Sequence, residues 1–252
     1  MAWSDPVQLY CERTGPGFWD EPLNAISNAA FLLIAIVAWQ RWHHRGSGDR
    51  VTLAFVGLAA IIGGGSFIFH TLATRGAALF DTIPIAIFVY GYFLLALARY
   101  LGLPIVLAGL ATVVFAALSM GLRAGLQGAF NGSGDYLPAL AGLIGIGLVL
   151  KLRTTPVSPD HARSESDAVH GVSHVLFEQT LRRRAAGRSL LLAALVFAIS
   201  LVFRTIDISI CDVVSVGTHF IWHGLNAVVL YILLRTAIDF GSNKAVSTPV
   251  QS

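Results

Sequence analysis

The chain has 252 residues, of which 55% are hydrophobic and only 12% carry a charge. These proportions exclude an ordinary water-soluble domain, in which about a quarter of the residues are charged. The formal net charge is +3, but basic and aromatic residues do not alternate as in many nucleic-acid binders, so no nucleic-acid partner is expected.

Residues 1–21 precede the first apolar stretch and are polar. They include Glu12, Asp20 and Glu21, and they lack the order of basic, apolar and small residues that marks a cleaved signal peptide. We therefore expect this segment to stay on the protein.

Seven stretches without Asp, Glu, Lys or Arg follow in chain order. They are residues 22–40, 51–74, 82–98, 100–122, 136–150, 189–203 and 213–234. A membrane-spanning helix needs about 20 mainly apolar residues, so the two shortest stretches, 136–150 and 189–203, must extend into their polar flanks. The sequence predicts an all-α fold, an integral membrane bundle of seven transmembrane helices that residues 1–240 form as a single domain.

The distribution of basic residues predicts the orientation of this bundle, because short cytoplasmic loops are enriched in Lys and Arg. The 17 Lys and Arg residues all lie in the first, third and fifth loops or in the tail, except Arg13, Arg75, Arg123 and Arg204. The amino terminus is therefore expected outside and the carboxyl terminus in the cytoplasm. Residues 151–188 would form a long, flexible cytoplasmic loop, and the small polar residues 241–252 a disordered tail.

Three of the eight histidines lie inside apolar stretches, namely His70, His219 and His223. An ionisable side chain inside a membrane is costly and is by default a functional candidate. His219 and His223 are four residues apart, which places both rings on one face of a helix. In the predicted orientation these histidines and Asp81 all lie near the outer face, which would be periplasmic or lumenal. Unrelated histidines that hydrogen-bond between helices are the alternative.

Three imidazoles without a fourth protein ligand are typical of a catalytic zinc site, whose open position holds water. Asp81 could accept a proton from that water and pass it to a leaving group, while the Ser66 hydroxyl could stabilise an oxyanion. The alternative for Asp81 is to orient a ligating histidine, and that for Ser66 is helix packing. The run Gly63-Gly64-Gly65 beside Ser66 indicates close helix packing or local unwinding.

Three motifs resemble the alkaline ceramidase family, within a wider group of seven-helix hydrolases that includes adiponectin-receptor-like proteins. They are YCERTGPGFWDEPLNAISN at 10–28, GSFIFH at 65–70 followed by FDTIP at 80–84, and GTHFIWH at 217–223. The resemblance implies zinc ligation by His70, His219 and His223, with Ser66 and Asp81 catalytic. It also implies that the partner is a membrane lipid, ceramide or a similar amide, cleaved to a sphingoid base and a fatty acid.

The same resemblance implies two features of the outward face. The family carries an acidic calcium-binding segment near the amino terminus, which Glu12, Asp20 and Glu21 match in part; a helix-entry turn is the alternative. The family also has a disulfide that corresponds to Cys11 and Cys211, the two cysteines of this chain, and an oxidising compartment permits it. Free buried cysteines are the alternative.

The sequence therefore predicts a zinc-dependent lipid amide hydrolase. One alternative is a zinc hydrolase that cleaves an ester or another N-acyl lipid, since the same chemistry attacks either carbonyl. The other is a receptor or transporter that uses the metal structurally, although a proton pathway would need more intramembrane carboxylates than Asp81. Nothing in the sequence indicates the oligomeric state.

Overall fold

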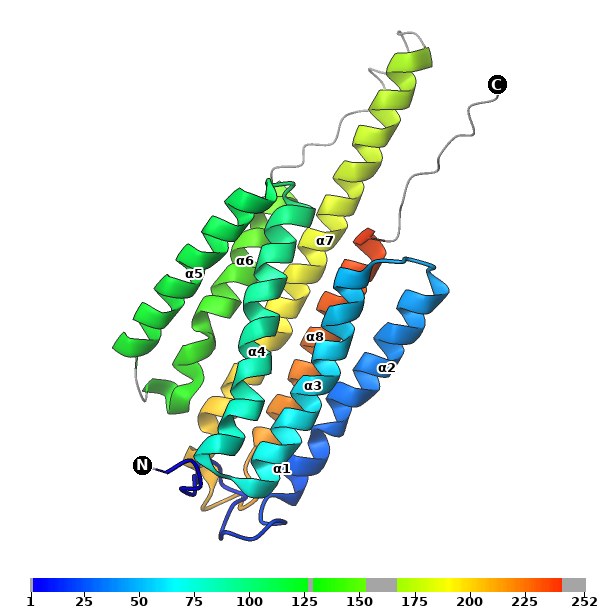
Figure 1. Ribbon diagram of the computed structural model, residues 1–252. Coiled ribbons are helices and arrows are strands. Elements are labelled where there is room, and N and C mark those ends of the chain that lie inside the picture. The colour runs from blue at the N-terminus through cyan, green and yellow to red at the C-terminus, as the bar shows by residue number, and fades with distance from the viewer. Residues whose placement is uncertain (1, 127–128, 153–166, 242–252) are drawn as a thin grey trace.

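The computed structural model describes residues 2–126, 129–152 and 167–241. Seven helices in these ranges are long and apolar enough to cross a membrane. They lie side by side with roughly parallel axes in one bundle (Figure 1). The predicted all-α, seven-helix membrane fold is therefore confirmed, whereas the orientation of the bundle in the membrane stays a prediction.

Short helices complete three of the spans. The elements are α1 (Pro22–Ser27), α2 (Ala29–His44), α3 (Arg50–Leu72), α4 (Arg75–Leu95), the π-helix η1 (Ala96–Tyr100), α5 (Ile105–Gly125), the 3-10 helix η2 (Ala129–Tyr136), α6 (Leu137–Leu152), α7 (Asp167–Ile206), the 3-10 helix η4 (Ile208–Ile210) and α8 (His219–Gly241). The first span combines α1 with α2, the third combines α4 with η1, and the fifth combines η2 with α6.

Capping side chains set the starts of α3 and α4. The Asp49 carboxylate accepts hydrogen bonds from the backbone N–H groups of Val51 and Thr52, and the Thr74 hydroxyl accepts one from Ala77. Such side chains replace the partners that the first N–H groups of a helix lack. The chain can therefore leave one helix and begin the next within a few residues.

The predicted loop 151–188 is wrong in its second half. Residues 153–166 lie outside the described residues, as do residues 242–252 of the predicted tail, but α7 begins at Asp167 and runs unbroken to Ile206. Its first turns project beyond the bundle (Figure 1). Residues 167–188 contain no proline and many Ala, Leu and Arg residues, which favour continuation of the helix past its apolar part.

Glycines bring α3 close to its neighbours. A Cβ atom at Gly63 would lie 2.9 Å from the Cβ atom of Phe31 in α2, and one at Gly65 would collide with the carbonyl oxygen of Phe80 in α4. Helix α3 is continuous through this run, so the glycines serve close packing and do not unwind the helix.

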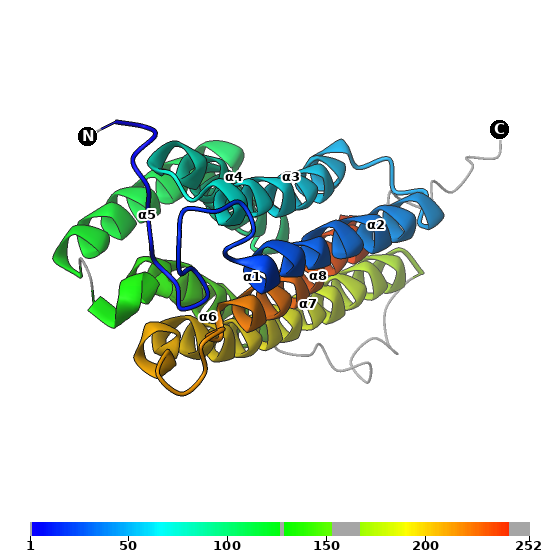
Figure 2. The same cartoon turned by 90° about the horizontal axis from the view of Figure 1, so that it is seen from below.

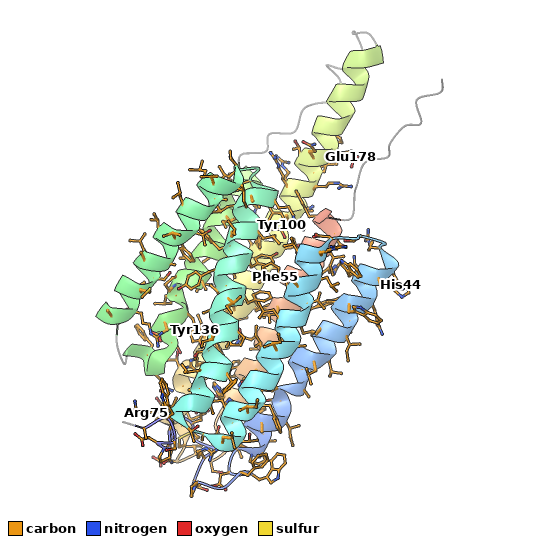
Figure 3. All side chains as sticks on the ribbon, in the orientation of Figure 1. His44, Phe55, Arg75, Tyr100, Tyr136 and Glu178 are labelled. Carbon is orange, nitrogen blue, oxygen red and sulfur yellow. A yellow bond between two sulfur atoms is a disulfide. The ribbon has the colours of Figure 1, made fainter. Side chains whose placement is uncertain are left out.

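The segment before α1 crosses the end of the bundle where α3 ends and α4 and α8 begin (Figure 2). The Val7 N–H donates to the Ala73 carbonyl at 2.8 Å, which fastens the segment to the turn between α3 and α4. Arg75 and Tyr136 mark this end of the bundle in Figure 3, and Glu178 marks the opposite end. The covered end is where the predicted site residues lie.

Candidate metal centre

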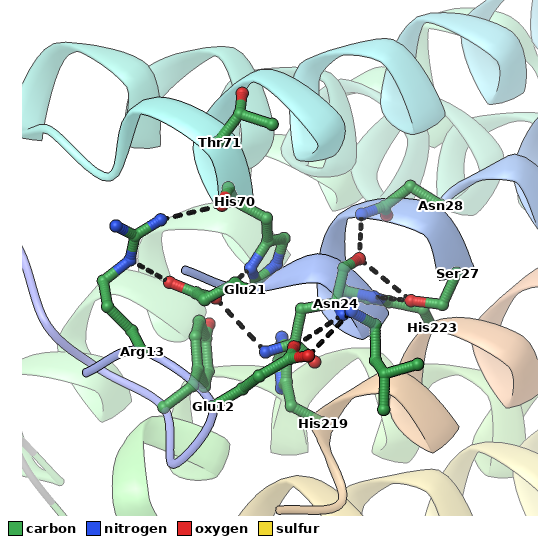
Figure 4. Close-up of polar contacts among 12 residues, drawn as sticks. Glu12, Arg13, Glu21, Asn24, Ser27, Asn28, His70, Thr71, His219 and His223 are labelled. Carbon is green, nitrogen blue, oxygen red and sulfur yellow. Dashed lines mark hydrogen bonds and ion pairs between the residues drawn. The ribbon is translucent and has the colours of Figure 1, made fainter. Parts of the chain in front are cut away.

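Three histidine side chains meet beneath the amino-terminal segment. His70 lies in the last turn of α3, and His219 and His223 lie in the first two turns of α8. All three are buried, and ring nitrogens of the three lie within 4.8 Å of one another (Figure 4). The structure thus brings together the three histidines that the sequence singled out. In the described part of the chain, no other three or more His, Cys, Asp or Glu side chains lie close enough to share an ion.

Two of the three rings are held through Nδ1. This atom of His70 lies 2.5 Å from Oε2 of Glu21, and that of His223 lies 2.7 Å from the Ser27 hydroxyl. Nε2 of His70 and Nδ1 of His219 are buried and have no hydrogen-bond partner in the protein. Because buried polar atoms are nearly always paired, these two orphaned nitrogens fit a metal ion, which neutral imidazoles bind well.

Glu21 is the centre of a polar network around His70. Its carboxylate forms a buried ion pair with Arg13 and accepts a hydrogen bond from Nδ2 of Asn24 at 3.2 Å (Figure 4). Burial disfavours the charge on Glu21, but the hydrogen bonds from His70, Arg13 and Asn24 outweigh burial and hold its pKa below the ordinary value. A charged carboxylate on the far side of a ligating ring fixes the orientation and tautomer of that ring.

Arg13 ties the amino-terminal segment to the end of α3. Its Nη2 donates to the His70 carbonyl at 2.8 Å, and its Nη1 donates to the carbonyls of Gly15 and Gly17 at 3.0 and 3.2 Å. The guanidinium is buried with Glu21. The network around His70 therefore depends on Arg13, which the sequence pattern did not identify as a site residue.

The carboxylates predicted to bind calcium have partners within the protein. Glu12 accepts hydrogen bonds from two backbone N–H groups at the start of α1, at 2.7 and 2.8 Å, and burial raises its pKa. Asp20 accepts one from a glycine N–H at 2.7 Å. Among the described residues, Glu12, Asp20 and Glu21 do not come together as a metal-binding group. Their contacts fold the segment, and calcium binding stays a prediction.

Asp207 positions the start of α8, although no sequence pattern identified it as a site residue. Its fully buried carboxylate accepts hydrogen bonds from the backbone N–H groups of Thr218 and His219, at 2.6 and 2.9 Å, and of Cys11 at 3.1 Å. A Cβ atom at Gly217, where φ is +63°, would collide with this carboxylate. Asp207 thus links the first metal-ligand candidate of α8 to the amino-terminal segment.

The predicted disulfide between Cys11 and Cys211 is confirmed, with Cα atoms 5.3 Å apart. The bond spans 200 residues of sequence and joins the segment before α1 to the loop between α7 and α8. It therefore holds the covering segment over the histidines.

Ser66 and Asp81 lie next to each other at the wall of a cavity. Ser66 follows Gly65, where α3 and α4 touch at Phe80, the residue before Asp81. Both residues line the same cavity as His219 and His223. The structure therefore brings the two predicted catalytic residues together, beside two of the three histidines.

The cavity is polar at the histidine end and apolar along its length. The empty space of the cavity, counted together with the open solvent at its mouth, is about 1060 Å³. Apolar lining residues are Ile85, Phe88, Phe93, Leu143, Ile146 and Leu233. The residues of α8 that line the cavity extend from His219 to Leu233, a distance of roughly 20 Å at about 1.5 Å per residue. The cavity therefore extends from the histidines into the apolar interior of the bundle.

Tyr10 and Arg204 complete the polar end, and the sequence patterns identified neither of them as a site residue. The Tyr10 ring stacks on the His219 ring, with centroids 3.6 Å apart, and its hydroxyl accepts a hydrogen bond from Nη1 of Arg204 at 3.1 Å. Burial raises the pKa of Tyr10 to about 12, so the phenol stays protonated. The sequence offered one indication of a functional role for these two residues: Arg204 lies at the end of an apolar stretch, where a charged residue is a functional candidate.

Comparison with known proteins gives no match: no protein-family model, no curated protein and no solved structure is significantly similar to this chain. The resemblance to alkaline ceramidases therefore stays a prediction from the motifs, and the function has to be inferred from the site.

Proposed function

We propose that this protein is a zinc-dependent hydrolase that cleaves the amide bond of a ceramide-like lipid in the membrane. The observation that supports this most directly is the histidine cluster, which has unpartnered buried nitrogens and lies at the polar end of a long apolar cavity. A metal-dependent lipid hydrolase needs buried nitrogen ligands for its metal and, beside them, a space for a hydrocarbon chain.

The donor set favours zinc. Three neutral imidazoles of His70, His219 and His223, with an oriented carboxylate behind one ring, are a common set of catalytic zinc ligands. When bound, zinc would polarise the scissile carbonyl and lower the pKa of a bound water to about 7.

Two side chains beside the histidines would complete the chemistry. The Asp81 carboxylate would accept a proton from the attacking water and return it to the leaving nitrogen as the C–N bond breaks. The Ser66 hydroxyl would donate a hydrogen bond to the carbonyl oxygen as negative charge develops there. Their shared place on the wall of the cavity that His219 and His223 also line supports this division of roles.

The lipid would enter with one chain along the apolar lining and its amide at the polar end. The cavity supports a long-chain substrate, whereas the choice of a ceramide-like amide comes from the motifs alone. A zinc hydrolase that cleaves an ester or another N-acyl lipid is the alternative within the same chemistry.

The test is a metal and product analysis of the purified protein in detergent. We expect about one zinc ion per chain, and release of a fatty acid from ceramide but not from a non-hydrolysable ether analogue, with products identified by mass. His219→Ala should lose both zinc and turnover. His43→Ala, at an exposed position at the other end of the bundle, is the matched control and should keep both.

Two results would count against the proposal. If the purified protein is folded but contains no zinc, it is not a zinc hydrolase. Zinc-loaded protein that cleaves neither amides nor esters, and that loses only stability in His219→Ala, would indicate a metal-stabilised receptor or transporter instead.

A further inference from the structure

Arg204 lies in the last turn of α7, at the polar end of the cavity. Its guanidinium carbon is 5.3 Å from the ring centroid of Tyr136, 5.4 Å from that of Trp222 and 5.8 Å from that of Tyr10. These three aromatic rings hold the cation in one place by cation–π contacts. The charged group is therefore fixed beside the histidines, since Tyr10 also stacks on His219.

The charge of Arg204 is not matched by an acidic neighbour. Across the described residues, no carboxylate oxygen lies within ion-pair distance of its guanidinium. Asp81 acts on it only at longer range. Its Nη1 donates to the Tyr10 hydroxyl, while its Nε is buried and has no hydrogen-bond partner. A buried donor on a cation needs an acceptor, and an anionic acceptor satisfies it best.

The geometry points to a binding site for a carboxylate. We propose that Arg204 and Tyr10 form a carboxylate subsite of the cavity, next to the metal centre. The guanidinium offers the planar pair of N–H donors that a carboxylate accepts. The Tyr10 hydroxyl accepts from Arg204 and has its own hydrogen to donate to the same anion.

The carboxylate has two possible sources, and both rest on the proposed function. Hydrolysis of a lipid amide adds the water oxygen to the acyl carbon, transfers protons to the departing nitrogen and leaves a fatty acid that ionises to a carboxylate. Its chain would still occupy the apolar part of the cavity. Alternatively, the carboxylate belongs to the amine half of the substrate, as in an N-acyl amino acid.

The first experiment measures ligand binding and needs no turnover. Thermal unfolding of the zinc-loaded protein in detergent is followed with palmitate and with hexadecanol, which share a chain and differ in the carboxylate. We expect palmitate to stabilise the wild-type protein more than hexadecanol does. Arg204→Gln should weaken palmitate binding about tenfold or more, as loss of a charge-assisted hydrogen bond predicts, and leave hexadecanol binding unchanged.

Matched variants show whether palmitate binds at this subsite or elsewhere on the protein. Arg123→Gln removes an exposed arginine whose partner is Asp135 outside the cavity, and it should bind palmitate as the wild type does. Tyr10→Phe should weaken palmitate binding less than Arg204→Gln does. If Arg204→Gln does not fold, Tyr10→Phe provides the test of the subsite in its place. Repeating the assay after zinc removal distinguishes binding of palmitate by Arg204 from binding by the metal. If Arg204 binds the carboxylate, the wild-type protein should still prefer palmitate to hexadecanol without zinc.

The second experiment identifies the source of the carboxylate. If the site holds the product, Arg204→Gln should relieve inhibition of ceramide cleavage by palmitate. If it holds the substrate, Arg204→Gln should raise KM for N-palmitoylglycine more than for neutral N-palmitoylethanolamine. Equal binding of palmitate and hexadecanol by the wild type, or a palmitate preference that Arg204→Gln retains, overturns the inference. Selective palmitate binding without hydrolysis of any lipid would keep the subsite and refute only the hydrolase.

Discussion

Nδ1 of His70 and the Glu21 carboxylate are 2.5 Å apart, although the two residues are 49 positions apart in the sequence. The contact joins the last turn of α3 to the residue that precedes α1, and Arg13 holds the same carboxylate from the other side. The orientation of one candidate metal ligand thus depends on the folded amino-terminal segment.

Glu21→Gln should weaken zinc binding by about 10- to 100-fold, because the neutral amide orients the His70 ring less firmly and makes it a poorer ligand. Competition with a chelator of known affinity measures the change. Asp20→Asn is the control, since the Asp20 carboxylate accepts its hydrogen bond from the Gly17 N–H, within its own turn. Unchanged zinc affinity in Glu21→Gln would show that the network serves folding alone.

Asp81→Asn should retain zinc and lose turnover by about a hundredfold to ten-thousandfold, because an amide is unable to accept the proton of the attacking water. Zinc content and initial rates are measured on the same preparation. Asp135→Asn, which alters an exposed ion pair, should change neither. Equal loss of zinc and activity in Asp81→Asn would assign Asp81 a structural role.

Asp207→Ala should lower the free energy of unfolding by about 3 kcal/mol, since three backbone N–H groups lose a buried charged acceptor. Because one of them belongs to His219, zinc should also dissociate more readily. Denaturant unfolding in detergent and zinc retention on dilution test these effects. The exposed Asp212 provides the control Asp212→Ala, and equal stability of the two variants would contradict the prediction.

The variant Asp49→Asn tests how the stability that the Asp49 carboxylate contributes at the start of α3 depends on pH. Burial opposes ionisation of Asp49, but hydrogen bonds from Arg99 and Thr52 prevail and keep its pKa below the ordinary 3.8. The carboxylate therefore contributes stability that is present above pH 3.8 and is lost as the pH falls through the lower folded-state pKa.

At neutral pH we expect Asp49→Asn to cost about 1 kcal/mol, because Asn still caps the helix but lacks the charge that pairs with Arg99. The difference from wild type should shrink in acid below that range, as followed by thermal unfolding. Asp5→Asn, at a more exposed ion pair, should show little difference at either pH. A difference for Asp49→Asn that does not change with pH would contradict the assigned sign.

Much of the site was predictable because few residue types are tolerated inside a membrane. His70, His219 and His223 stand out in apolar stretches, and the i, i+4 spacing places two of them on one helical face. Ser66 lies one helical turn before His70, and Asp81 opens the next apolar stretch, whereas their catalytic roles are implied by the resemblance alone. The glycine run in α3 indicates close packing from sequence alone, but Phe80, which Gly65 touches, was identifiable only in the folded bundle.

Other site residues carried no local signal. Tyr10 and Asp207 lie outside the apolar stretches, where polar and aromatic residues are ordinary, and Glu21 was predicted as a calcium ligand rather than as the partner of His70. Their roles arise when the disulfide and the contacts of Arg13 bring the amino-terminal segment over the end of the bundle.

The sequence by itself determined that this chain forms a seven-helix membrane bundle and which imidazoles meet, because a lipid environment demands long apolar helices and leaves few places for ionisable side chains. Only the tertiary structure decided how those imidazoles are oriented, where the apolar cavity runs and that Arg204 faces it. These properties depend on contacts between residues far apart in the sequence, and the apolar composition of individual helices does not encode which of their faces will meet.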